Sequence, residues 1–135
     1  MTQRQRLENI IIGTLLDIAD HYEECKSCIT ADMFLDDRNR SIYEMVTEMR
    51  SEGTGQTDPH SIFHRYGEKV LDLLPYMCEV CTEFSFEWKK TRFNEDVYLK
   101  NIIYGDNLQP TGVEFIDYVS QFLNIALKDE KTATN

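Results

Sequence analysis

Helical periodicity governs this chain: apolar residues recur every three to four positions along most of its length, and no segment alternates with a period of two. Gly13 interrupts the first such segment, and we interpret it as a point where another helix approaches closely. The pattern predicts an all-α fold, a compact orthogonal bundle of about five to six helices that ends in an αα-hairpin. The first apolar face is formed by Leu7, Ile10, Ile11, Thr14, Leu15 and Ile18 and is widened by Ile12 and Leu16.

Capping residues predict where several helices begin and end. Thr30 precedes a short helical turn, and a longer helix follows over about residues 38–50. Residues 51–57 favour a loop because two glycines stand among polar residues. Asp58-Pro59 then starts a short helix, since Asp is a favourable N-cap and Pro suits the first helical position. Gly67 ends that helix.

The second half of the chain carries a weaker pattern. Residues 83–92 mix three aromatic side chains with charged ones, and we predict a loop there. An αα-hairpin is predicted over residues 94–128, with its second helix introduced by the capping box Thr111-Gly-Val-Glu114. We therefore predict one domain over residues 1–128 and a flexible polar tail over residues 129–135.

A net charge of −10 over 135 residues limits the kinds of partner. Proteins that bind duplex DNA carry a stripe of basic residues that neutralises phosphates, and the nearest cluster here is only Lys89, Lys90 and Arg92. We therefore expect no direct nucleic-acid binding. No apolar run reaches the ~20 residues that cross a bilayer, and no signal peptide precedes the first helix. We expect a cytoplasmic protein without membrane contact, whose four cysteines are reduced thiols.

No established catalytic pattern is present in the spacing of glycines, cysteines and histidines. None of the six glycines is followed by Lys-Ser or Lys-Thr as in a P-loop, so we expect no ATPase, no other enzymatic activity and no cofactor. His60 and His64 are interpreted as solvated side chains at a helix start. Two C-x-x-C pairs leave a zinc-stabilised binding module as an alternative, with the ligands Cys25, Cys28, Cys78 and Cys81. Residues 29–77 separate the pairs, far more than the about 15–20 of a compact zinc ribbon.

The order of residues over about 7–83 matches a known pattern. Leu7-Glu-Asn-Ile-Ile-Ile-Gly-Thr-Leu-Leu16, Ile29–Phe34 and Arg38–Tyr43 resemble three segments of the N-terminal domain of DnaB-type replicative helicases. Asn39 stands where that family more often has His. Weaker similarity continues through the turn around Gly53 and the helix after Pro75. The residues that carry the resemblance are core and capping positions: Gly13, Leu16, Phe34, Arg38, Ile42, Tyr43 and Asp58.

The resemblance implies a function in protein recognition rather than in unwinding. In that family this domain forms a collar above the motor domains, pairs through helical hairpins and contacts other replication proteins. We therefore expect a stand-alone, non-catalytic interaction and dimerisation module of DNA replication whose partners are a second copy, a replicative helicase, a primase or a helicase loader. Apolar residues of the hairpin exceed what two helices hide from each other, and the predicted interface among them is Tyr98, Ile102, Ile103, Phe115, Tyr118 and Phe122, with Tyr104 and Leu127 on the same helices.

Two further hypotheses remain open at this point. The chain is alternatively the N-terminal part of a divided or truncated replicative helicase, with the motor encoded in a neighbouring reading frame. The charge of −10 by itself also suggests an acidic mimic of DNA.

Overall fold

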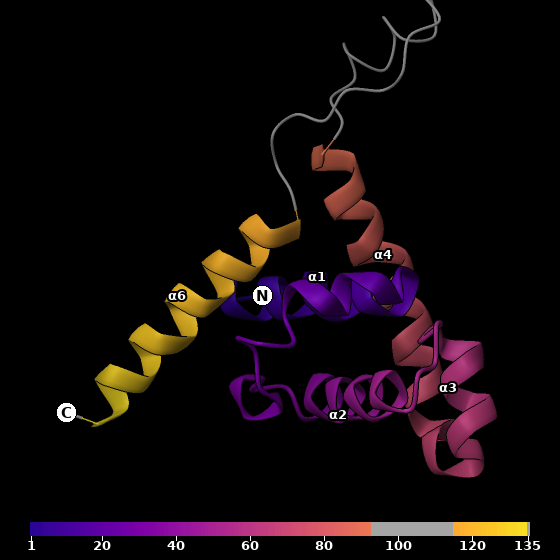
Figure 1. The fold of residues 1–135 in the computed structure, drawn as a ribbon. Helices are drawn as coiled ribbons and strands as arrows, with labels where there is room; N and C mark the ends of the chain where they lie inside the picture. Colours follow the sequence, from indigo (N-terminus) through magenta and orange to yellow (C-terminus); the bar gives the residue numbers. More distant parts are fainter. Residues whose placement is uncertain (93–114, 135) are drawn as a thin grey trace, which may run out of the picture.

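The computed structural model describes the backbone of residues 1–92 and 115–134 and the side chains of residues 1–84 and 115–129. All regular structure in these ranges is helical, and they contain no strand, which confirms the all-α prediction. Figure 1 shows the arrangement. The elements are, in chain order, α1 (Gln3–Asp17), the 3-10 turns η1 (Ala19–Glu24) and η2 (Ala31–Met33), α2 (Asp37–Ser51), α3 (Pro59–Tyr66), the 3-10 segment η3 (Gly67–Leu73), α4 (Leu74–Arg92) and α6 (Phe115–Thr134).

Helix α1 is the centre of the fold (Figure 1). It packs against α4 and α6 and also contacts η1 and α2. Every residue from Leu7 to Leu16 is buried, including the polar Glu8 and Asn9. A helix on the surface of a domain leaves the residues opposite its apolar stripe in solvent, so α1 is enclosed by its neighbours. Gly13 lies within this enclosed stretch.

The predicted starts and ends of the middle helices are confirmed. Asp36 is the N-cap of α2, and its carboxylate accepts hydrogen bonds from two backbone amides of the first turn. Asp58 is the N-cap of α3 and Pro59 its first residue, but the Asp58 carboxylate accepts from the hydroxyl of Ser61 at 2.5 Å rather than from a backbone amide. Gly67 closes α3 with a φ of 65°, a conformation that favours glycine.

The prediction of a loop over residues 83–92 is wrong, and the residues predicted as a tail from 129 are helical as far as Thr134. Helix α4 runs without a break from Leu74 to Arg92. Its one proline, Pro75, lies in the first turn, and no glycine follows, so nothing in this stretch ends a helix. Helix α6 likewise continues to Thr134. The first helix of the predicted hairpin and the capping box at Thr111 lie outside the described residues.

An aromatic cluster joins the last helix to the middle of the chain. The ring of Phe34 stacks on that of Phe122 with 5.3 Å between centroids and also lies 5.0 Å from the ring of Tyr43. The hydroxyl of Tyr43 donates to the carbonyl of Ile29 at 2.8 Å, so this polar group is satisfied inside the core. Burying an aromatic side chain of this kind contributes about 1.5–3 kcal/mol. The segment before α2 is therefore part of what holds α6 in place.

Candidate interaction surface

Helix α6 has two apolar faces, and the inner one is buried within the chain. Each inner residue is less than a tenth exposed. The inner face follows helical spacing and packs on α1, while the ring of His21 lies 4.9 Å from that of Phe115. The inner face consists of Phe115, Tyr118, Val119, Phe122 and Ala126.

This burial corrects half of the predicted interface. Phe115, Tyr118 and Phe122 belong to the chain's own core instead of facing a partner. Helix α1 offers them an apolar surface in the same molecule, and packing against it avoids the loss of translational and rotational freedom that association with a second molecule costs. Tyr98, Ile102 and Ile103 lie outside the described residues.

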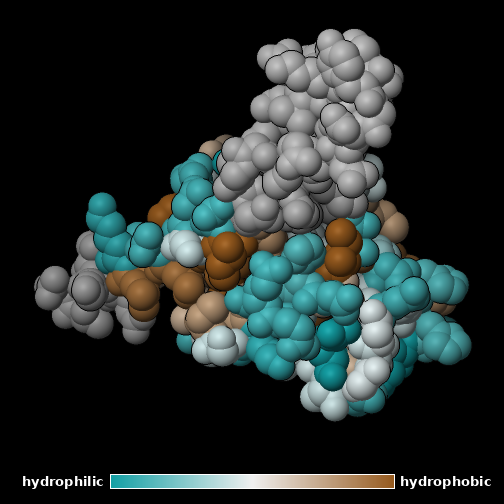
Figure 2. Space-filling model, turned by 45° about the horizontal axis from the view of Figure 1, so that its top comes forward, coloured by the Kyte–Doolittle hydropathy of each residue, from teal (hydrophilic) through white to brown (hydrophobic). Residues whose placement is uncertain are grey.

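The outer face of α6 carries apolar residues that stay exposed. Ile116 is 45% and Leu127 is 47% exposed, and the partly buried Leu123 lies between them together with the small, exposed Ser120. These four positions share one side of the helix, because their spacings of four, three and four residues follow its period. Figure 2 shows apolar surface along helix α6, at the left of the view, next to hydrophilic surface. The spacing of the outer stripe is present in the sequence, but the inner stripe on the same helix is more hydrophobic and dominates the periodicity.

A groove of about 470 Å³ lies at the Leu127 end of this stripe. Met33 and Leu35, from the segment before α2, line one side, and Ala126 and Leu127 line the other. Leu35 is 62% exposed. Contiguous exposed apolar residues are typical of protein-binding sites, whereas single ones are common on any surface. We call Ile116, Ser120, Leu123, Leu127 and Leu35 the α6 outer surface.

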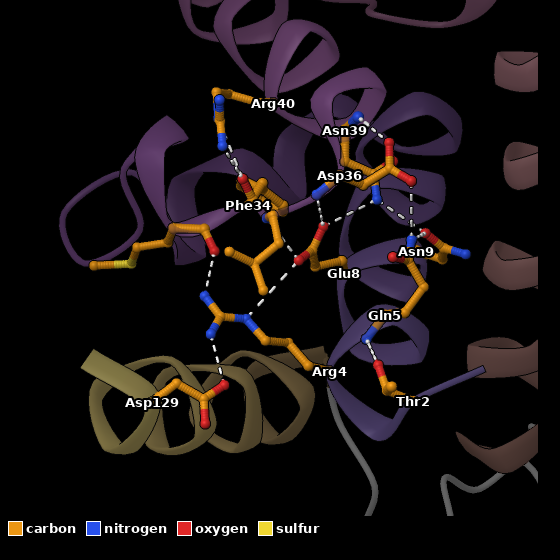
Figure 3. Close-up of polar contacts among 12 residues, drawn as sticks. Thr2, Arg4, Gln5, Glu8, Asn9, Phe34, Asp36, Asn39, Arg40 and Asp129 are labelled. Carbon is orange, nitrogen blue, oxygen red and sulfur yellow. Dashed lines mark hydrogen bonds and ion pairs between the residues drawn. The ribbon is translucent and has the colours of Figure 1, made fainter. Parts of the chain in front are cut away.

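Arg4 holds the elements around this groove together (Figure 3). Its guanidinium donates to Asp129 of α6 at 2.7 Å and to the backbone carbonyl of Met33 at 2.7 Å. Its Nε lies 3.9 Å from a carboxylate oxygen of Glu8 one turn further along α1. The Arg4 side chain is only 13% exposed, so it is largely removed from water, and the planar guanidinium fits several acceptors at once. One side chain of the first helix therefore positions both walls of the groove.

The carboxylate of Glu8 is fully buried and accepts hydrogen bonds from the segment that precedes α2. The backbone amide of Leu35 donates to one of its oxygens at 2.9 Å, and the amide of Asp36 donates to the other at 3.3 Å. The side-chain amide of Asn39 donates to the second oxygen at 3.2 Å. Buried carboxylates are stable only when they are paired and hydrogen-bonded in this way. Glu8 therefore sets the path of the segment that presents Leu35.

Asn39 links Glu8 to a wider polar network. Its amide nitrogen also donates to Asn9 at 2.9 Å, while its amide oxygen accepts from the hydroxyl of Tyr76 at 2.5 Å. An amide supplies donors and an acceptor at the same time without carrying charge, which suits this fully buried position. Burial raises the pKa of Tyr76 to about 12, so its hydroxyl stays a donor at neutral pH.

Arg38 covers the outside of this network. Its guanidinium lies 3.8 Å from the centroid of the Tyr76 ring and forms an ion pair with Asp36 at 2.8 Å. The hydrogen bond from Arg38 lowers the pKa of Asp36 below its ordinary value of 3.8, with backbone amides of α2 contributing in the same direction. The ionised N-cap of α2 is thereby stabilised.

The residues that carry the sequence resemblance lie at helix starts or in the core. Arg38 and Asp58 lie at helix starts, as described above. The others are buried in or beside the core: Gly13, Leu16, Phe34, Ile42 and Tyr43.

The four cysteines do not form a metal site in this fold. Within residues 1–84 and 115–129, no three His, Cys, Asp or Glu side chains converge so that they could hold an ion. Cys25 is buried, Cys28 and Cys81 are half-buried, and Cys78 is exposed. Burial raises the pKa of the Cys25 thiol to about 12. The described part of the chain therefore does not bring the four predicted zinc ligands together. In addition, no helix in the described ranges has the length and apolar character of a membrane span.

Comparison with known proteins identifies the family. The family model described as the DnaB-like helicase N terminal domain matches residues 1–85, from α1 into α4. Curated proteins and solved structures were also compared with the chain, and none matches. The DnaB N-terminal domain is the part of the helicase that does not contain the ATPase. The matched range includes the Glu8 network, while α6 lies beyond it. This chain belongs to the family of DnaB-like helicase N-terminal domains.

Proposed function

We propose that this chain is a non-catalytic interaction module of DNA replication that pairs with a second copy through the α6 outer surface. The observation that carries the proposal is the exposed apolar stripe of α6 on a domain of the helicase N-terminal family. Exposed apolar helix surface is stabilised when a second protein covers it. A helicase, a primase or a helicase loader are the further partners that the family membership suggests.

The outer stripe is self-complementary in an antiparallel arrangement. Its spacings of four, three and four residues are the same in both directions along the helix. A two-fold axis near the middle of α6 would therefore place Ile116 against the partner's Leu127 and Ser120 against the partner's Leu123. Small residues then oppose large ones, as close helix packing requires, and each contact occurs twice, as in an isologous dimer. The same register brings Asp117 near the partner's Lys128, which adds opposite charges at both ends.

The length of the stripe limits the strength of pairing. From residue 116 to residue 127 the helix rises about 16 Å, at 1.5 Å per residue. Leu35 extends the apolar surface beyond the Leu127 end. A contact of this size is small among specific protein interfaces, so we expect association that depends on protein concentration over the micromolar range.

Light scattering over a concentration series tests the pairing. The wild-type chain should rise from the monomer mass of 15.9 kDa toward twice that value. Leu127→Glu should hold the chain at the monomer mass, because a carboxylate on the apolar contact must be desolvated. Leu71→Glu is the matched control, since Leu71 is 49% exposed on η3, away from α6. A wild-type chain that stays monomeric at every concentration, or equal effects of the two substitutions, would contradict the proposal.

A charge-pair variant tests the antiparallel register. Ile116→Glu and Leu127→Lys should each weaken pairing when introduced alone. In the double variant every Glu at 116 faces a Lys at 127 of the partner, so pairing should recover. A parallel arrangement would instead place like charges opposite each other, and the double variant would pair more weakly than either single one.

Contact with replication proteins is tested with purified components. The labelled chain is titrated with the replicative helicase of the same host, and separately with its primase and its loader. We expect saturable binding to at least one of them, and binding to none would remove this part of the proposal. A reading frame directly downstream that encodes a P-loop motor would favour the alternative of a divided helicase.

A further inference from the structure

Two histidines of α3 form an exposed pair, and neither of them belongs to the α6 outer surface. His60 and His64 lie four residues apart, so their side chains project from one side of the helix, one turn from each other. Both are exposed, and neither imidazole has a hydrogen-bond or ion-pair partner in the part of the chain that the structure describes. His21 differs in this respect, because its ring nitrogen lies 2.9 Å from the carboxylate of Glu24.

Both imidazoles line one hollow of about 690 Å³ between α3 and the loop after α2. Gln56 contributes an amide to its wall, and no carboxylate is among its described lining residues. Arg65 also lines the hollow, and its guanidinium pairs with Glu48 at 3.1 Å and with Glu52 at 3.0 Å. The imidazole nitrogens are therefore the strongest electron-pair donors in the hollow.

We propose that His60 and His64 together chelate a divalent transition-metal ion of the Cu²⁺, Ni²⁺ or Zn²⁺ class. Neutral imidazole is a preferred ligand for these ions. Two histidines four residues apart on one helix face present both nitrogens from a single rigid element, the spacing that helical metal sites use. Because no third His, Cys, Asp or Glu joins them among the described residues, water fills the remaining coordination positions. The site is open and exchangeable, unlike a closed structural site with four protein ligands.

Calorimetry with each metal chloride alone tests the proposal. All samples carry Cys78→Ser, because the exposed Cys78 thiol would compete for the same ions. We expect one ion per chain at neutral pH, with Cu²⁺ binding more tightly than Ni²⁺ or Zn²⁺. Loss of a partner that only orients a metal ligand weakens metal binding about 10–100-fold. Loss of a direct ligand in His60→Ala or His64→Ala should weaken binding by at least this factor. The control His21→Gln should leave binding unchanged.

Thermal unfolding supplies a second readout that does not depend on any partner protein. An ion that binds only the folded chain stabilises it by mass action, so the midpoint should rise with metal concentration and the rise should vanish in the double variant His60→Ala/His64→Ala. Both positions are exposed, and circular dichroism checks that the variants fold. Undiminished binding by the double variant, or no binding of Cu²⁺ at millimolar concentration, would overturn the proposal. This site and the α6 pairing are independent, so either can fail without the other.

Discussion

Arg4 in the first helix and Asp129 in the last form an ion pair with 2.7 Å between Nη1 and Oδ2, across 125 positions of sequence. Arg4 is largely buried, whereas the Asp129 side chain is 54% exposed. The same guanidinium also binds the carbonyl of Met33. Exposed ion pairs contribute little on their own, so the contacts of Arg4 on its buried side, to Met33 and Glu8, hold the guanidinium at the position where it meets Asp129.

Substitutions at the two ends of this pair should differ in cost. Arg4→Ala removes the hydrogen bonds that the charged guanidinium donates, and the carbonyl of Met33 loses this donor. We therefore expect a loss of about 1–3 kcal/mol in the free energy of unfolding. Asp129→Asn should cost about 1 kcal/mol or less, because that partner is exposed. Urea unfolding measures both. Equal losses would contradict this, because they would mean that the buried contacts of Arg4 add nothing to the contribution of the exposed pair.

Glu8 should be among the most sensitive polar positions in the chain. Glu8→Ala leaves the amides of Leu35 and Asp36 and the side chain of Asn39 without an acceptor inside the protein. We expect a loss of about 3–5 kcal/mol, the cost of removing one member of a buried charged cluster. Glu8→Gln keeps an acceptor oxygen and should cost less. Chemical unfolding compares the two variants, and a Gln variant as unstable as the Ala variant would contradict the assigned role.

The contribution of the Asp36 cap should depend on pH. The folded-state pKa of Asp36 lies below its ordinary value of 3.8, so ionisation stabilises the folded chain above that value and the contribution is lost as the pH falls through the folded-state pKa. Asp36→Ala should therefore cost about 1 kcal/mol near neutral pH, as expected for an N-cap. The difference between wild type and variant should shrink below about pH 4. A difference that stays constant into strong acid would contradict this.

The two faces of α6 should respond differently to truncation. Phe122→Ala removes a fully buried ring that stacks on Phe34 and should cost about 3–5 kcal/mol of stability. Leu127→Ala on the outer face should change the stability of the monomer little and weaken self-association instead. Denaturation in dilute solution, combined with light scattering at high concentration, separates the two effects. A large loss of monomer stability in Leu127→Ala would place that residue in the core.

The cysteines should react with alkylating reagents in the order of their exposure. Cys78 is exposed and should be modified first, whereas Cys25 is buried and its pKa is raised to about 12, so little thiolate is present. Mass spectrometry after brief alkylation at mildly alkaline pH should show Cys78 modified and Cys25 intact. All four should react in denaturant. Early modification of Cys25 would mean that the segment after η1 opens readily.

Capping chemistry and helical periodicity are local properties, and they predicted much of this fold from the chain alone. Asp58-Pro59 and Gly67 determine the ends of α3 through backbone conformations that those residues favour. The apolar spacing around Leu7–Leu16 identified α1 and its family resemblance. The break predicted within α4 was wrong because mixed aromatic and charged residues do not end a helix without a Gly, a Pro or a competing cap.

Packing between distant segments decided the rest. Helix α6 carries two apolar stripes, and only the position of α1 determines that Phe115 and Phe122 lie inside while Ile116 and Leu127 lie outside. The polar residues Glu8 and Asn39 resemble surface residues in the sequence, yet both are buried, because distant partners satisfy their polar atoms and one hydrogen bond joins the two across 31 positions. Periodicity shows that a helix has apolar sides. Which of these sides is buried and which meets solvent depends on where the neighbouring helices pack.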